Sequence, residues 1–150
     1  MQKKQIKAGL VGHPLSGSLS REVFAVFSEL TGAGIAYVPV DCDPEDLERV
    51  IPTFEADGWA GFNVTLPYKT RVCALLALAD PAAKACGAVN CVRFGRAGLE
   101  GLNTDARALL EVFCEASFDP AGRDAVIFGS GGSAASSGWA LGRSRAASVT

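Results

Sequence analysis

The most restrictive feature of the sequence is the alternation of short apolar segments with longer amphipathic ones. Alternation along a segment predicts a strand, whereas apolar residues three and four positions apart predict a helix. Strands that alternate with helices build a mainly parallel sheet with helices on both faces. We expect strands at residues 6–11, 35–40, 60–64, 88–94, 99–102, 124–128 and 147–150, and helices at residues 20–30, 43–58, 70–79, 81–86, 104–116 and 134–141.

Two glycine-containing turns refine this expectation. Residues 95–98 read Gly-Arg-Ala-Gly between two apolar segments, which predicts a hairpin and therefore one antiparallel strand. Residues 118–122 contain Pro and Gly and are the best candidate for a domain boundary. The sequence thus predicts an α/β fold, with a three-layer, mainly parallel sheet that includes one antiparallel strand, followed by a shorter segment.

Composition excludes several classes of partner. The chain has 150 residues and a formal net charge of −2, which argues against nucleic acid and against an anionic membrane surface. No apolar segment is long enough to span a bilayer, and the first residues lack the apolar core of a signal peptide. We therefore expect a cytoplasmic protein.

The metal-ligating residues are few and dispersed. The five cysteines show no CxxC spacing, and His13 is the only histidine, so a metal site is not expected. Reduced, mostly buried thiols in a cytoplasmic protein are the simpler interpretation of the cysteines. His13 is interpreted as a turn residue at the rim of a cleft.

Lys69 is the first candidate for chemistry. It follows the apolar strand that runs into Asn63 and Thr65, and Pro67 ends that strand because it has no amide hydrogen. A lysine just beyond a strand lies at the carboxyl edge of the sheet, where ligands bind in open α/β folds. Lys69 is therefore a candidate acid, base or anion clamp, although most lysines are simply solvated.

Two further polar groups precede predicted helices. Ser18 and Ser20 lie at a helix start, where hydroxyls and free amides can hold a carboxylate or phosphate. Asp105 lies in the first turn of another helix, and Asn90 near a strand could recognise a hydroxyl group. The alternative is ordinary capping by Ser20 and by Thr104.

A glycine-rich loop lies between a predicted strand and a predicted helix. Glycines there let the backbone approach a dinucleotide pyrophosphate, which then faces the helix N-terminus. A glycine pattern alone is weak, and its position between strand and helix strengthens it. The loop contains Gly129, Ser130, Gly131, Gly132 and Ser133.

Taken together and in this order, these segments resemble the shikimate dehydrogenase family. The strongest matches are Gly-Phe-Asn-Val-Thr-Leu-Pro-Tyr-Lys at 61–69, Gly-Ala-Val-Asn at 87–90 and Gly-Leu-Asn-Thr-Asp at 101–105. The resemblance implies NADP-dependent interconversion of 3-dehydroshikimate and shikimate, in chorismate and aromatic amino-acid biosynthesis. It also implies a substrate-binding catalytic domain at residues 1–117 and an NADP-binding segment at residues 118–150.

The resemblance assigns roles to individual substrate-binding residues. Ser18 and Ser20 match the serines that hold the substrate carboxylate. Thr65, Asn90 and Asp105 match groups that hydrogen-bond the ring hydroxyls.

The resemblance also assigns the catalytic pair and the cofactor loop. Lys69 and Asp105 match the catalytic pair, with Lys69 also contacting substrate. A cationic Lys69 would stabilise the forming alkoxide and donate its proton, and Asp105 would orient Lys69 and keep it protonated. The cofactor loop matches Gly129, Ser130, Gly131, Gly132 and Ser133.

The first family motif is altered in this chain. That motif usually runs His-Ser-x-Ser-Pro, with a second His soon after. Gly17 replaces the first His, Arg21 replaces the Pro, and Phe24 occupies the second His position. Both serines are present, so we expect the carboxylate clamp to be kept.

The nucleotide-binding domain of the family is longer than the corresponding part of this chain. We therefore expect a truncated Rossmann-type segment that is poorly ordered or depends on contacts with the first domain, and that does not support useful dehydrogenase activity alone. Two alternatives remain: a binding module or pseudoenzyme for shikimate-like acids, and a paralogue that acts on quinate. The expected partner is a small molecule, and the expected assembly is a monomer or homodimer.

Overall fold

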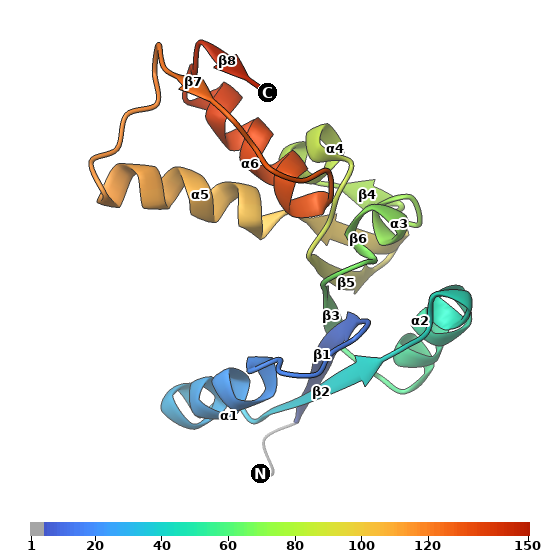
Figure 1. Ribbon diagram of the computed structural model, residues 1–150. Coiled ribbons are helices and arrows are strands. Elements are labelled where there is room, and N and C mark those ends of the chain that lie inside the picture. Colours follow the sequence, from blue (N-terminus) through green and yellow to red (C-terminus); the bar gives the residue numbers. More distant parts are fainter. Residues whose placement is uncertain (1–4) are drawn as a thin grey trace.

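The computed structural model describes residues 5–150, and its centre is a six-stranded sheet. The strand order is β2-β1-β3-β5-β6-β4, and a separate two-stranded sheet pairs β7 with β8 (Figure 1). The strands are β1 Ile6–Gly12, β2 Ile35–Asp41, β3 Gly61–Val64, β4 Leu78–Ala79, β5 Cys91–Gly95, β6 Gly98–Leu102, β7 Asp124–Ala125 and β8 Ser148–Val149. The helices are α1 Ser20–Thr31, α2 Leu47–Ala56, α3 Lys69–Cys73, α4 Pro81–Cys86, α5 Thr104–Glu115 and α6 Gly132–Arg143, with a 3₁₀ turn η1 at Pro44–Asp46.

The directions of the strands confirm the predicted sheet. β1 pairs in parallel with both β2 and β3, and β4 pairs in parallel with β6. Only β5 runs against its neighbours, because it is antiparallel to β3 and to β6. The hairpin across residues 95–98 therefore supplies the one antiparallel strand of the large sheet.

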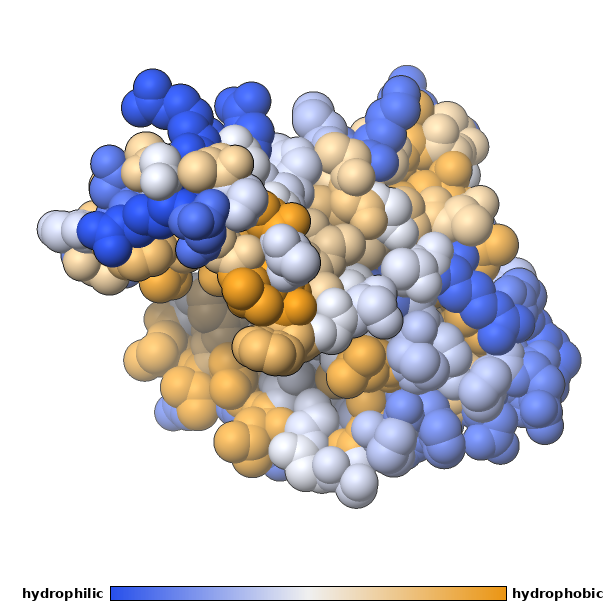
Figure 2. All heavy atoms as spheres, turned by 45° about the horizontal axis from the view of Figure 1, so that its top comes forward, coloured by the Kyte–Doolittle hydropathy of each residue, from blue (hydrophilic) through white to orange (hydrophobic). Residues whose placement is uncertain are grey.

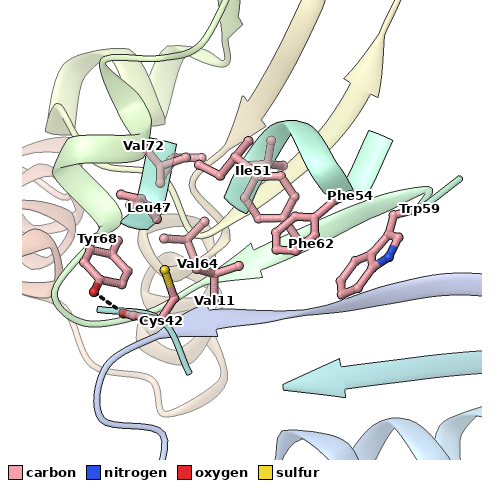
Figure 3. Packing of buried hydrophobic residues seen from close by; sticks show 12 residues of the cluster. Val11, Cys42, Leu47, Ile51, Phe54, Trp59, Phe62, Val64, Tyr68 and Val72 are labelled. Carbon is pink, nitrogen blue, oxygen red and sulfur yellow. Dashed lines mark hydrogen bonds between the residues drawn. The ribbon is translucent and has the colours of Figure 1, made fainter. Parts of the chain in front are cut away.

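The core lies between the sheet and α2, α3 and the segments around them. Leu47 and Ile51 of α2 point onto Val11 and Val64 of the central strands (Figure 3). The hydroxyl of buried Tyr68 donates a hydrogen bond to the Cys42 carbonyl, which ties the turn before α3 to the end of β2. This packing fixes the carboxyl ends of β1 and β3, and therefore the place where α3 begins.

Several element boundaries differ from the sequence expectation. The helix expected at 70–79 is only α3, because residues 78–79 pair with β6 as an edge strand. The strand expected at 124–128 is limited to residues 124–125. Both differences concern short edge strands, which are set by pairing partners that local periodicity does not reveal.

Helix α1 is more exposed than its amphipathic pattern predicts. The predicted amphipathic helix is present, yet none of its residues is buried among the described residues. Figure 2 shows apolar side chains over the lower left of the molecule, where α1 lies in Figure 1. The exposed apolar residues of α1 are Val23, Val26, Phe27 and Leu30.

Gly101, the first residue of the Gly-Leu-Asn-Thr-Asp motif, has a packing role in β6. A Cβ atom at this position would lie 2.3 Å from Leu76 Cδ1 and 2.7 Å from Val89 Cγ2. A larger residue would therefore push apart the segments that lead to α4 and β5. The glycine allows the close packing that brings residues 88–90 beside residues 103–105.

Candidate functional site

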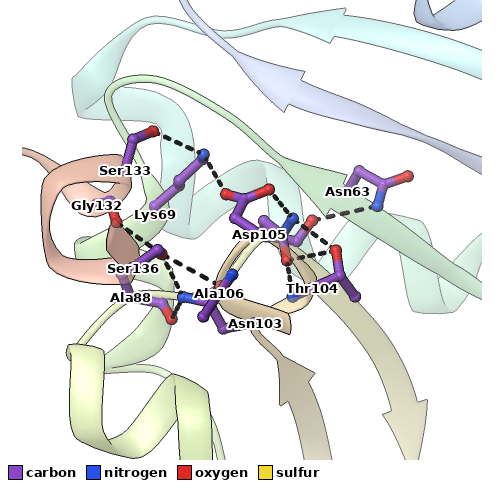
Figure 4. Close-up of polar contacts among 11 residues, drawn as sticks. Asn63, Lys69, Ala88, Asn103, Thr104, Asp105, Ala106, Gly132, Ser133 and Ser136 are labelled. Carbon is purple, nitrogen blue, oxygen red and sulfur yellow. Dashed lines mark hydrogen bonds and ion pairs between the residues drawn. The ribbon is translucent and has the colours of Figure 1, made fainter. Parts of the chain in front are cut away.

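Lys69 lies at the centre of a polar cluster at the carboxyl end of β3. It is the first residue of α3, and its Nζ atom lies 2.7 Å from Asp105 Oδ2. The Lys69 side chain is only 14% exposed, and that of Asp105 is 36% exposed. The turn after β3 and the start of α5 thus bring together two residues that lie 36 positions apart in the sequence (Figure 4).

Asn90 holds the other side of the Asp105 carboxylate. Its Nδ2 atom donates to Asp105 Oδ1 at 2.6 Å and to Thr104 Oγ1 at 2.8 Å. Its Oδ1 atom accepts from the Thr104 amide at 2.8 Å. Asp105 therefore accepts a hydrogen bond from an amide on one oxygen and pairs with an ammonium on the other, so its orientation toward Lys69 is fixed.

The start of α5 corrects one sequence expectation. Thr104 was expected to be the cap, but Thr104 is already helical and Asn103 is the N-cap residue. The Asn103 side chain accepts a hydrogen bond from the Ala106 amide at 2.9 Å. Thr104 is therefore free to bind Asn90, and Asp105 lies in the first turn, where the helix dipole favours its negative charge.

Asn63 lies next to this cluster and supports the backbone at Asn90. Its Oδ1 atom accepts from the Tyr37 hydroxyl at 2.8 Å, and its Nδ2 atom donates to the Asn90 carbonyl at 3.2 Å. Burial, with a smaller effect from Cys91, raises the pKa of Tyr37 to about 12. Tyr37 thus remains a neutral donor, and Asn63 supports the backbone that carries Asn90.

Ser18 and Ser20 lie together at the start of α1. The Ser18 hydroxyl donates to Ser20 Oγ at 3.2 Å, and the Ser20 amide approaches Ser18 Oγ at 3.4 Å. Ser20 was expected to cap the helix, but the N-cap position is Leu19, which has no side-chain cap bond. No hydrogen bond among the described residues joins either serine to Lys69 or Asp105.

The loop that leads to these serines is held by Asp41, a residue that belongs to none of the sequence motifs. Asp41 Oδ2 accepts from the Leu15 amide at 2.9 Å, and Oδ1 lies 2.7 Å from His13 Nδ1. The Leu15 amide, and then His13, lower the pKa of Asp41. His13 therefore helps to anchor this loop through its contact with Asp41.

Thr65 lies between Ser20 and Lys69 in the sequence, directly after β3. Its amide donates to the Val11 carbonyl at 2.9 Å, which continues the pairing of β3 with β1. Its methyl group packs over Gly12, where a Cβ atom would lie 2.4 Å from Thr65 Cγ2. No side-chain hydrogen bond holds the Thr65 hydroxyl among residues 5–150, so this group can bind a ligand.

The glycine-rich loop reaches the Lys69 cluster directly. Gly131 is the N-cap residue of α6, and the Ser133 hydroxyl lies 3.4 Å from Lys69 Nζ. A Cβ atom at Gly132 would lie 2.9 Å from Lys69 Cβ. A larger residue at position 132 would therefore collide with the Lys69 side chain. The glycine pattern of the sequence does not reveal this contact.

Among residues 5–150, no three His, Cys, Asp or Glu side chains lie close enough to hold a metal ion. No helix in the described part of the chain is long and apolar enough to cross a membrane.

A family model for the shikimate dehydrogenase substrate binding domain matches residues 10–92. This chain belongs to that family. The matched residues include the strand that ends before Lys69 and the segment that carries Asn90, whereas Asp105 and the glycine-rich loop lie beyond the match.

Individual relatives extend the similarity to the rest of the chain. A shikimate dehydrogenase (NADP(+)) of Rubrobacter xylanophilus is 45% identical over 134 residues, which cover 89% of this chain and 47% of the relative. This member of the shikimate dehydrogenase family thus spans about half the length of the curated relatives it matches.

Solved structures of the family have the same fold. Shikimate dehydrogenase 1 from Peptoclostridium difficile has a TM-score of 0.90 and 32% identity, covering 97% of this chain and 55% of its own. Shikimate 5-dehydrogenase from Listeria monocytogenes, solved with shikimate and NAD, has a TM-score of 0.83 and 28% identity, covering 94% of this chain and 49% of its own.

Gly132 offers a test of the contact between the loop and the lysine. We expect Gly132→Ala to lower the free energy of unfolding by about 1–3 kcal/mol, because the new methyl group must displace Lys69 or α6. Gly138→Ala is the matched control, since its Cβ atom would lie 3.7 Å from Ile127 Cδ1, an ordinary contact. Urea denaturation of both variants measures the effect, and an equal free energy of unfolding in the two would contradict this packing.

Proposed function

We propose that this chain is the substrate-binding part, with the start of the NADP-binding part, of a shikimate dehydrogenase. The reaction is the NADP-dependent interconversion of 3-dehydroshikimate and shikimate, in chorismate and aromatic amino-acid biosynthesis. The observation that carries this proposal is the contact of Lys69 with both Asp105 and Ser133, which joins a proton donor to a dinucleotide-type loop.

The proposed chemistry needs a proton at the oxygen that becomes a hydroxyl. When bound at the glycine-rich loop, NADPH would supply the hydride for the carbonyl carbon of 3-dehydroshikimate. The Lys69 ammonium hydrogen-bonds the carbonyl oxygen, stabilises the negative charge that forms on it and donates the proton. Asp105 and Asn90 hold that ammonium in place through the bonds described above. In the reverse direction, the same nitrogen atom accepts the proton of the shikimate hydroxyl.

The proposed substrate contacts involve the serines at the start of α1, Thr65, and the polar side chains of the Lys69 cluster. Ser18 and Ser20 bind the carboxylate, since their hydroxyls contact only each other and one backbone amide among the described residues. Thr65, Asn90 and Asp105 bind the ring hydroxyls together with Lys69. Asp41 keeps the serine loop in register through its bond to Leu15.

The residues of the glycine-rich loop fit a dinucleotide. The N-terminus of α6 presents free amides, which attract an anion. No heavy atom lies within 4 Å of a Cβ built at Gly129 or at Gly131, so a pyrophosphate can approach their backbone. We propose that this loop, with Ser130, Gly132 and Ser133, holds the NADP phosphates.

The proposed organisation has two domains. Residues 1–117 form the substrate-binding catalytic domain, and residues 118–150 begin the nucleotide-binding domain. The protein acts in the cytoplasm, where reduced cysteines persist, and the five cysteines are all free thiols in the structure.

The proposed function is tested by an assay of NADP⁺ reduction with shikimate, with quinate in a parallel sample. We expect the complete dehydrogenase that contains these residues to reduce NADP⁺ with shikimate, and the 150-residue chain alone to bind shikimate saturably without producing NADPH. Shikimate binding without turnover in the complete protein would favour the binding module. Turnover with quinate alone would favour the paralogue. Absence of both turnover and saturable shikimate binding would contradict the proposal.

A further inference from the structure

Two buried polar side chains link the proposed substrate site to the helix that follows the glycine-rich loop. Asn103 and Ser136 are each only 1% exposed. Asn103 precedes α5, whereas Ser136 lies in α6, 33 positions later in the sequence. Figure 4 shows them pointing toward each other, next to the Lys69 cluster.

The hydrogen bonds of Asn103 use its whole amide group. Its Nδ2 atom donates to the Ala88 carbonyl at 3.0 Å and to Ser136 Oγ at 2.9 Å. Its Oδ1 atom accepts from the Ala106 amide at 2.9 Å. The Ser136 hydroxyl can then donate to the Gly132 carbonyl at 2.9 Å. All partners lie within the protein, so the two side chains form a complete buried network.

Each of these bonds ends beside a residue of the proposed site. Ala88 lies two residues before Asn90, Ala106 directly follows Asp105, and Gly132 directly precedes Ser133. A displacement of Asn103 or Ser136 would therefore move the proposed substrate groups relative to the loop. The hydroxyl of Ser133 touches Lys69 only when α6 keeps its present position.

We infer that Asn103 and Ser136 are positioning residues that fix the glycine-rich loop against Lys69 and Asp105. The catalytic meaning of this inference rests on the proposed function. Among the described residues, neither side chain hydrogen-bonds to Lys69, so each acts through the backbone segments that it joins. Because hydride transfer depends on alignment, a shift of about 1 Å between the two segments can lower turnover about a hundred-fold.

The coupling between the two side chains can be measured without any ligand. Ser136→Ala removes the shared bond, and Asn103→Ser keeps a capping oxygen but loses the donors to Ala88 and Ser136. A double-mutant cycle on the unfolding of the 150-residue chain should give a coupling of about tenfold in the unfolding equilibrium constant. Strictly additive effects would overturn the linkage.

The positioning role requires a second, kinetic readout. In a protein that carries this site and turns over shikimate, Ser136→Ala should lower turnover at least about tenfold and leave the dissociation constant of shikimate within about twofold of wild type. Ser137→Ala is the matched control on the same helix, since its side chain makes no hydrogen bond among the described residues, and it should leave both quantities unchanged.

The two readouts separate the inference from the proposed function. A wild-type protein that neither turns over nor binds shikimate contradicts the proposed function, while the cycle still decides the linkage. Unchanged turnover in Ser136→Ala, or a loss of shikimate affinity as large as the loss of turnover, overturns the positioning role.

Discussion

In a protein that carries this site and turns over shikimate, replacing Lys69 by alanine will lower kcat about a hundred- to ten-thousand-fold, because general acid catalysis typically contributes that much. The Lys69 ammonium is the proposed proton donor and has no substitute in contact with Asp105 Oδ2 in the described part of the chain. The dissociation constant of shikimate will change far less, since Ser18 and Ser20 hold its carboxylate. Steady-state kinetics with shikimate and NADP⁺, with shikimate binding measured by calorimetry, separate the two effects.

Two control variants make this result specific. Lys84→Ala removes an exposed lysine of α4 and will leave kcat unchanged. Lys69→Met keeps the length of the side chain without its charge and will lose activity as Lys69→Ala does. An unchanged kcat in Lys69→Ala would remove Lys69 from the chemistry, and a purely proportional rise in KM would make it only a binding residue.

Leu47→Ala will produce the largest loss of stability among the changes considered, about 2–5 kcal/mol in the free energy of unfolding. Leu47 is 0% exposed and belongs to the core cluster between α2 and the sheet. Its removal leaves a cavity beside residues that support the start of α3. Urea denaturation followed by circular dichroism measures the change.

Leu30→Ala is the matched control for this loss. Leu30 lies on the apolar face of α1 and is 81% exposed, so its truncation will change the free energy of unfolding by no more than about 0.5 kcal/mol. A loss at Leu30 equal to that at Leu47 would contradict the burial pattern described for α1.

The comparison of these two leucines shows what periodicity can predict. Both lie in helices whose apolar spacing was read correctly from the sequence. Spacing identifies which face of a helix is apolar, but whether another element covers that face depends on tertiary packing. The edge position of β4 and the short β7 have the same origin, because pairing partners lie far away in the sequence.

The candidate site was more predictable than the element boundaries. Lys69, Asn90 and Asp105 lie in motifs whose order matches the family, and the structure brings these three side chains together. The cap of α5 was missed because Asn103 and Thr104 are both good capping residues, and only side-chain geometry distinguishes them.

Other contacts had no signal in the sequence. The bond of Asp41 to Leu15 and the contact of Ser133 with Lys69 join segments that have no shared motif. Gly132 was recognised as part of a phosphate loop, yet its tight contact is with the Lys69 side chain. Such contacts between distant segments require coordinates, since each residue has several common roles on its own.

The most direct test of the proposed site is a titration of the ¹⁵N-labelled chain with shikimate, followed by NMR. We predict saturable shifts of the amide resonances of Asn90, Thr104 and Asp105, together with those of Ser18 and Ser20. Cyclohexanecarboxylate, which has the carboxylate but no hydroxyls, should shift only the serine resonances. Absence of saturable shifts at Asn90 and Asp105, or equal shifts there with both acids, would contradict the account of this site.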